Sequence, residues 1–343
     1  MAILRYIIPI TVAMLLAGCE KEFLPKIDSK PVLCVNSLIT AGEPINVNVT
    51  HTWVFNDVKG DTLHNVTDAK VSIYINGELA SDNDIPKEGD NIRIVAQSEE
   101  YGDAEASVTV PYSVPIELMD FTHEILDAND NPYLQNTEDI RFNLKFRIKV
   151  YDTHSTDDLF KLSFTEWHKY GDDIVYGDDR FSDSQYASLY LGTFNYNSEP
   201  IFDECLNVYE DIIGDYGSTT PLVFTDGQFS NKDYTLTLGF EGASFSVKDP
   251  DYNMALYDCG ILFSVSTISR SYYDHELNIL QLSKGYINNL ADMGFAEQVW
   301  GYSNVSTGAG VVAARAVSTI TVSFKDFIEQ TLHDDRPGGK CRR

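Results

Sequence analysis

The chain has 343 residues, which is enough for two domains, and 43% of them are hydrophobic, which suffices for packed cores. Its 25 lysines and arginines stand against 52 aspartates and glutamates, giving a formal net charge of −27. Such a surface repels phosphate backbones and anionic membranes, so the composition excludes a nucleic-acid-binding protein.

The first 18 residues are typical of a secretory signal peptide that ends at a lipid-attachment site. Arg5 precedes the apolar run Tyr6–Leu16, and the run leads into Leu-Ala-Gly-Cys19. This run is shorter than the roughly 18 to 20 residues that span a membrane. We therefore expect residues 1–18 to be removed and Cys19 to carry palmitate-like acyl chains that anchor the protein. Residues 19–30 then form a lipidated tether.

Residues 31–112 are predicted to form an immunoglobulin-like β-sandwich. The segments Pro31–Ile39 and Pro44–Val54 are rich in β-branched residues, and three later segments alternate apolar with polar residues. These three are centred on Ile73, Ile94 and Val108. The dipeptide Asn76-Gly77 is a strong hairpin turn signal. Several short strands with turns between them are characteristic of this fold.

Residues 113–330 are predicted to form a larger antiparallel β-sandwich. From Ile140 to Val150, apolar side chains alternate with charged and polar ones, so one face is buried. Further strand patterns cover Leu159–Phe164, Ala187–Phe194, Tyr234–Phe240, Gly260–Ile268 and Val317–Phe324. The whole chain is therefore predicted to be all-β, apart from one inserted helix.

That helix is predicted near residues 271–292. Tyr273, Leu277 and Leu280 have helical spacing, Ser271 is a candidate cap, and an interruption is expected near Gly285. Residues 331–343 are predicted to be a flexible tail.

Four cysteines remain besides Cys19, namely Cys34, Cys205, Cys259 and Cys341. Cys205 and Cys341 are a candidate disulfide because a bridge would secure the tail, but free buried thiols are an equal alternative. No cysteine or histidine spacing indicates a zinc site.

The sequence contains no recognised catalytic motif. It lacks a G-x-S-x-G elbow, an H-E-x-x-H helix, a phosphate loop and a G-x-G-x-x-G turn. We therefore expect a non-enzymatic protein with no catalytic or cofactor-binding residues. Abundant acidic pairs leave a surface hydrolase of glycan or peptide as an alternative, and a structural envelope protein is another.

Calcium is the one cofactor that the acidic composition leaves open. The segment Asp127–Asn131 begins like a calcium-binding loop, and Glu138 stands at the twelfth position. Pro132, however, occupies the position where such a loop needs glycine. The segment is therefore predicted to be a turn, and no bound metal or cofactor is expected.

Aromatic residues interleaved with acids form the candidate ligand-binding site: Trp167, Tyr170, Tyr176, Phe181 and Tyr186. Aromatic faces beside carboxylates suit sugars or cations. The alternative is that these aromatics belong to the core of a strand pair.

Three stretches resemble a known family. They are Pro31–Ile39, the pair Tyr272-Tyr273, and Phe295–Val311, which contains Tyr-Ser-Asn-Val followed by Gly308 and Gly310. With the lipid-attachment motif, they are similar to Bacteroidetes lipoproteins of the domain-of-unknown-function 4249 family. The two glycines indicate a sharp turn or a close backbone approach.

The resemblance implies a place in the outer membrane, often beside TonB-dependent transporters. Glu20 and Glu22 are similar to the acidic signal that directs such lipoproteins to the cell surface. No catalytic residue is implied. We therefore expect a lipoprotein facing the cell exterior that binds a glycan, a peptide or a TonB-dependent transporter, and no nucleic acid.

Overall fold

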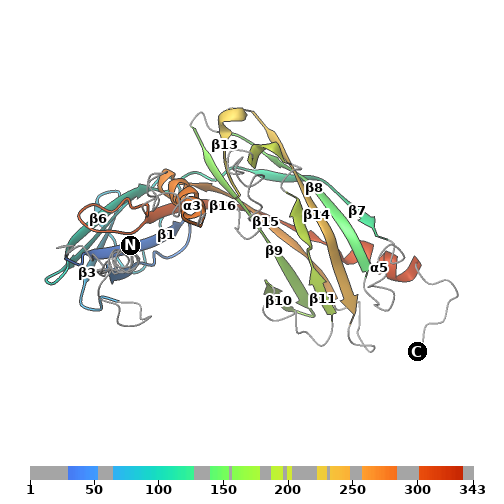
Figure 1. Ribbon diagram of the computed structural model, residues 1–343, viewed down its shortest axis with the longest axis horizontal. Coiled ribbons are helices and arrows are strands. Elements are labelled where there is room, and N and C mark those ends of the chain that lie inside the picture. The colour runs from blue at the N-terminus through green and yellow to red at the C-terminus, as the bar shows by residue number, and fades with distance from the viewer. Residues whose placement is uncertain are drawn as a thin grey trace, which may run out of the picture. The chain divides into compact units, whose positions relative to one another are not determined.

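Strands make up most of the structure, which is a computed structural model (Figure 1). The residues that it describes are 30–52, 65–126, 140–153, 157–177, 187–195, 199–202, 222–229, 232–247, 257–283 and 301–334. From Val32 onward these residues belong to one compact unit. The predicted all-β class with an inserted helix is confirmed.

The strands are β1 (Leu33–Thr40), β2 (Asn48–His51), β3 (Lys70–Ile75), β4 (Glu78–Leu79), β5 (Asn91–Ser98), β6 (Gly102–Thr109), β7 (Ile116–Ile125), β8 (Ile140–Val150), β9 (Leu159–Tyr170), β10 (Asp173–Tyr176), β11 (Ala187–Tyr190), β12 (Thr193–Asn195), β13 (Val223–Thr225), β14 (Tyr234–Val247), β15 (Tyr257–Ile268) and β16 (Val312–Ser323). The helices are α3 (Arg270–Ser283) and α5 (Lys325–Asp334), with short 3-10 turns η3 (Pro200–Phe202) and η4 (Asp226–Gln228).

Within the described residues the strands form three sheets. The smallest has four strands in the order β4-β3-β5-β6. A five-stranded sheet has the order β11-β14-β8-β7, with β12 beside β14, and a seven-stranded sheet has the order β10-β9-β15-β16-β1-β2, with β13 beside β9. The seven-stranded sheet therefore includes strands from both ends of the chain.

The N-terminal core lies between β1 and the four-stranded sheet. Leu33 and Val35 of β1 form a buried cluster with Ile92 and Ile94 of β5, as the alternating pattern predicted. The hairpin between β3 and β4 turns at Asn76-Gly77, where both residues have positive φ, 53° and 88°. This is the two-residue turn that the dipeptide predicted.

The larger core lies between the five-stranded sheet and the part of the seven-stranded sheet around β9 and β15. The predicted buried face of β8 is confirmed, because Phe142, Leu144, Phe146, Ile148 and Val150 are at most 2% exposed. Aromatic rings interlock across the two sheets. The Phe146 and Phe263 ring centroids lie 4.8 Å apart, and so do those of Phe164 and Phe240, both with edge-to-face geometry.

Strand β16 belongs to two ladders (Figure 1). Its first residues, Val312–Arg315, pair in parallel with Ser37–Thr40 of β1, and the remainder pairs antiparallel with β15. The sequence pattern predicted this strand only from Val317 onward. The part of β16 before Val317 contributes to the N-terminal core, where Val312 and Ala314 are buried.

The segment before β16 approaches β1 closely, and its glycines permit that approach. A Cβ atom on Gly308 would lie 2.6 Å from the Leu33 carbonyl oxygen, and one on Gly310 would lie 2.2 Å from the Val35 carbonyl oxygen. Gly310 also has a φ of 110°. The glycines therefore serve close backbone packing.

Asn304 closes the loop that leads into β16. Its Nδ2 donates to the Val312 carbonyl oxygen at 2.8 Å, and its Oδ1 accepts from the Val312 N–H at 2.9 Å. The neighbouring Val305 is buried in the N-terminal core. The Tyr302–Gly310 stretch thus joins the start of β16 to the N-terminal core.

Helix α3 begins one residue earlier than predicted, and its cap is different. The prediction that Ser271 caps the helix is wrong. Ser269 accepts from the Tyr272 N–H at 3.3 Å through Oγ, while Ser271 Oγ donates to the Val312 carbonyl oxygen. The expected interruption near Gly285 lies outside the described residues. Among the described helices, none is long and apolar enough to cross a membrane.

Helix α5 packs on the larger core through Phe327 and Ile328. The helix includes residues 331–334, which the sequence pattern assigned to the flexible tail, and residues 335–343 lie outside the described residues.

The close approach at Gly310 yields a stability prediction. In Gly310→Ala, the new Cβ must displace the β1 backbone at a strained φ, so we expect a loss of about 2–4 kcal/mol of unfolding free energy in urea titrations. Gly42→Ala is the matched control, because Gly42 also has positive φ but a methyl group added there would meet nothing within 4 Å, and it should lose about 1 kcal/mol. Equal losses in both variants would contradict the close-packing explanation.

Candidate functional site

A cavity of about 690 Å³ lies where β1, the chain entering β2, helix α3 and the start of β16 meet. Its volume is within the range of small-molecule binding sites. The lining combines amide, hydroxyl, aromatic and apolar groups: Asn36, Ser37, Leu38, Asn46, Val47, Asn48, Tyr272, His275, Glu276, Val311 and Ala313.

One face of α3 forms a wall of the cavity. Tyr272, His275 and Glu276 are spaced at i, i+3 and i+4, so their side chains lie on the same side of the helix. Tyr272 is 9% exposed and packs in a small cluster with Ile268 and Ala313. The wall is therefore fixed to β15 and β16.

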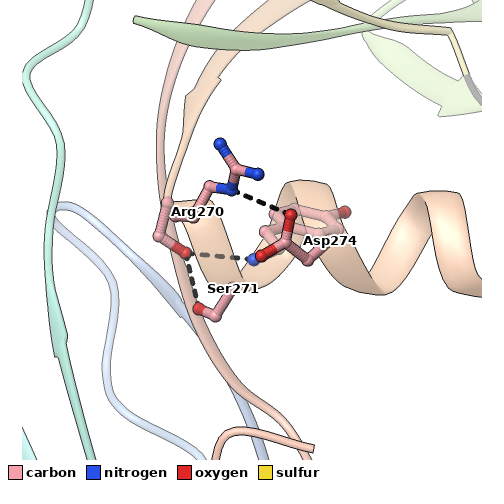
Figure 2. A network of polar contacts seen from close by, with 5 residues as sticks. Arg270, Ser271 and Asp274 are labelled. Atoms are coloured by element: carbon pink, nitrogen blue, oxygen red, sulfur yellow. Dashed lines mark hydrogen bonds and ion pairs between the residues drawn. The ribbon is translucent and has the colours of Figure 1, made fainter. Parts of the chain in front are cut away.

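Polar side chains cluster at the first turn of α3 (Figure 2). Arg270 Nε and Asp274 Oδ1 form an ion pair of 2.8 Å one turn apart, on the helix itself. Ser271 Oγ donates to the Val312 carbonyl oxygen at 2.9 Å, which joins the helix to β16. The start of the helix is thus tied to the strand that pairs with β1.

The β1 side of the cavity is held by side-chain to backbone bonds. Asn36 Oδ1 accepts from the Val311 N–H at 3.0 Å, and Ser37 Oγ donates to the Asn46 carbonyl oxygen at 2.8 Å. Asn36 also stands directly opposite Asn48 in the β1–β2 pairing. The exposed side chains of Asn46 and Asn48 remain at the cavity edge, where they can bond to a ligand.

The negative charge of Glu276 on α3 is compensated by Lys161 of β9. Lys161 Nζ lies 2.6 Å from Glu276 Oε1 and 3.4 Å from the Tyr272 hydroxyl, and these two charged side chains are 25% and 15% exposed. Lys161 Nζ also lies 5.0 Å from the centre of the Tyr272 ring. The one carboxylate in the cavity lining is therefore paired with a lysine.

A second cavity, of about 500 Å³, lies at the β3–β4 hairpin and contains Asp84 and Asp90. Both carboxylates accept backbone hydrogen bonds, from Ser81 and Lys87 respectively, and these bonds lower the pKa of each. A general acid for glycoside hydrolysis needs a raised pKa instead. Each of these carboxylates instead caps a turn, by accepting from a backbone N–H three residues earlier in the chain.

The structure describes only part of the predicted aromatic ligand site, and the described residues differ in exposure. Trp167 of β9 is only 6% exposed, whereas Tyr176 of β10, its direct cross-strand neighbour, is 58% exposed. Tyr170 is the last residue of β9, and Phe181 and Tyr186 lie outside the described residues. The buried Trp167 fits the alternative of a core aromatic, and ligand binding here stays a prediction.

Several other predicted residues fall outside the part of the chain that the structure describes. They are Cys19, the Asp127–Asn131 segment with Glu138, and the candidate disulfide pair Cys205 and Cys341. Of the remaining cysteines, Cys34 is a partly buried free thiol and Cys259 is buried in the larger core.

Sequence reasoning missed the cavity because its residues come from four separate segments. The only local signals were the polar face of α3 and the asparagines at positions 36, 46 and 48. Asn36 comes to lie opposite Asn48 only through the pairing of β1 with β2.

A family model described as "Domain of unknown function (DUF4249)" matches residues 20–321. No curated protein and no solved structure matches the chain.

Proposed function

The chain belongs to the DUF4249 family, and we propose that it is a lipid-anchored binding protein of the outer membrane, facing the cell exterior and acting beside a TonB-dependent transporter in nutrient uptake. The lipid-attachment pattern ending at Cys19 supports the anchor. The family match, which begins at residue 20, is consistent with a mature chain that starts at Cys19.

The cavity beside α3 is the observation that carries the binding role. Its lining includes the exposed Asn46 and Asn48 and the largely buried Tyr272, and its one carboxylate is paired. Sugar hydroxyls and peptide groups form hydrogen bonds to amides, and their apolar faces pack on aromatic rings. We infer that the ligand is an uncharged stretch of glycan or peptide.

Binding to glycan and peptide arrays tests this proposal. We expect the full chain to bind a defined subset, and the double variant Asn46→Ala/Asn48→Ala to bind that subset about tenfold more weakly, because two ligand hydrogen bonds are lost. Asn83→Ala removes an amide from the β3–β4 hairpin cavity and should bind normally. Normal binding by the double variant would place the ligand site elsewhere, and an array with no bound ligand would count against a binding role.

The anchor is tested by cell fractionation. Cys19→Ala removes the acceptor of the lipid, so we expect the variant to leave the membrane fraction and appear in the soluble fraction. Cys34→Ala is the control, because Cys34 lies within β1, and it should stay with the membranes. Full membrane retention of Cys19→Ala would overturn the lipid anchor.

The same membranes, solubilised in mild detergent, test the partner. Recovery of the wild-type chain together with a transporter supports the accessory role, whereas recovery of the chain alone contradicts it.

A further inference from the structure

Three carboxyl side chains converge at one end of the larger sandwich, apart from the cavity. Asp152 follows the end of β8, Asp158 directly precedes β9, and Asp226 directly follows β13 as the first residue of η4. One oxygen from each lies within 4.8 Å of the other two. The chain thus gathers three negative groups from three segments at one point.

Asp226 is buried there with an unsatisfied oxygen. The residue is 1% exposed, and its Oδ2 has no hydrogen-bond partner among the described residues. Glu199, which is equally buried, provides the contrast. Its two oxygens accept from the Tyr234 hydroxyl at 2.5 Å and from the Thr237 N–H at 2.6 Å. A buried carboxylate oxygen without a partner is costly, and no described residue offsets that cost for Asp226.

The neighbouring carboxylates also affect the ionisation of Asp226. Burial raises the pKa of Asp226, a backbone hydrogen bond from Asp158 opposes that rise, and the charges of Asp152, Asp158 and Asp157 raise the pKa further. The neighbouring strands β9 and β13 contribute Phe160 and Phe224 to the larger core, with ring centroids 5.1 Å apart. Carboxylates this close repel one another, and a cation bound between them relieves that repulsion.

We propose that Asp152, Asp158 and Asp226 bind a calcium ion. Calcium coordinates oxygen ligands at about 2.3–2.6 Å, so one ion can bridge oxygens about 4.8 Å apart. Magnesium binds at about 2.0–2.1 Å and retains several waters, so it is expected to bind more weakly at a site with a buried carboxylate. Because β8 belongs to the five-stranded sheet and β9 and β13 to the seven-stranded sheet, the ion joins the two layers of the larger sandwich.

Thermal unfolding of the full chain in detergent tests the site, at about 0.15 M salt to screen nonspecific attraction to the acidic surface. Relative to EDTA, saturating calcium should raise the Tm of the wild type by about 5 °C, and magnesium should raise it less. Asp226→Asn should lose the calcium response yet unfold in EDTA at a Tm at least as high as the wild type, because it removes the buried charge. Asp173→Asn on β10 is the control, because it changes net charge equally and should keep the full response.

Calorimetric titration provides the second measurement. We expect the wild type to bind one calcium ion per chain and Asp152→Asn to bind none in the same titration. The Asp152→Asn variant tests the site even if Asp226→Asn does not fold. A wild type without a calcium-dependent Tm shift, an equal shift with magnesium, or a full calcium response in Asp226→Asn would each overturn the proposal.

Discussion

The parallel pairing of β1 with the first residues of β16 is the constraint on which the rest of the structure depends. Through this pairing, residues 305–314 complete the N-terminal core, since Val305, Val312 and Ala314 are buried beside Leu33 and Val35. The same strand then continues into the larger sandwich by pairing with β15. Helix α3 is tied to this junction through the hydrogen bond from Ser271 to Val312, so the pairing also positions one wall of the cavity.

The sequence predicted those elements whose two faces differ. β8 alternates apolar with polar side chains because one face meets the core and the other meets solvent. The first half of β16 gives no such signal, because Val312, Ala313 and Ala314 are all buried and two of them are alanines, which favour helix. Its assignment as a strand depends on the partner β1, some 270 residues away in the sequence, which no local pattern can indicate.

The two candidate sites escaped sequence analysis for a related reason. The cavity depends on pairing that brings Asn36 opposite Asn48, and the acidic cluster depends on two sheets that bring Asp152 and Asp226 together. In a chain with 52 acidic residues, no spacing distinguishes these three from the others. What distinguishes the cluster is the burial of Asp226. Buried Glu199 obtains its hydrogen bonds from neighbouring groups, whereas one oxygen of Asp226 has no hydrogen-bond partner among the described residues.

Native-state hydrogen exchange tests the central role of the β1–β16 pairing most directly. The amides of Val35, Ser37 and Ala41 donate to carbonyl oxygens of residues 309–315. If the pairing joins the N-terminal core to the larger core, these amides should exchange only through the same global opening that releases the β15–β16 ladder, with the same free energy. Exchange of these amides at a clearly lower free energy, while β15 and β16 stay protected, would show that the N-terminal core opens by itself and would contradict the account.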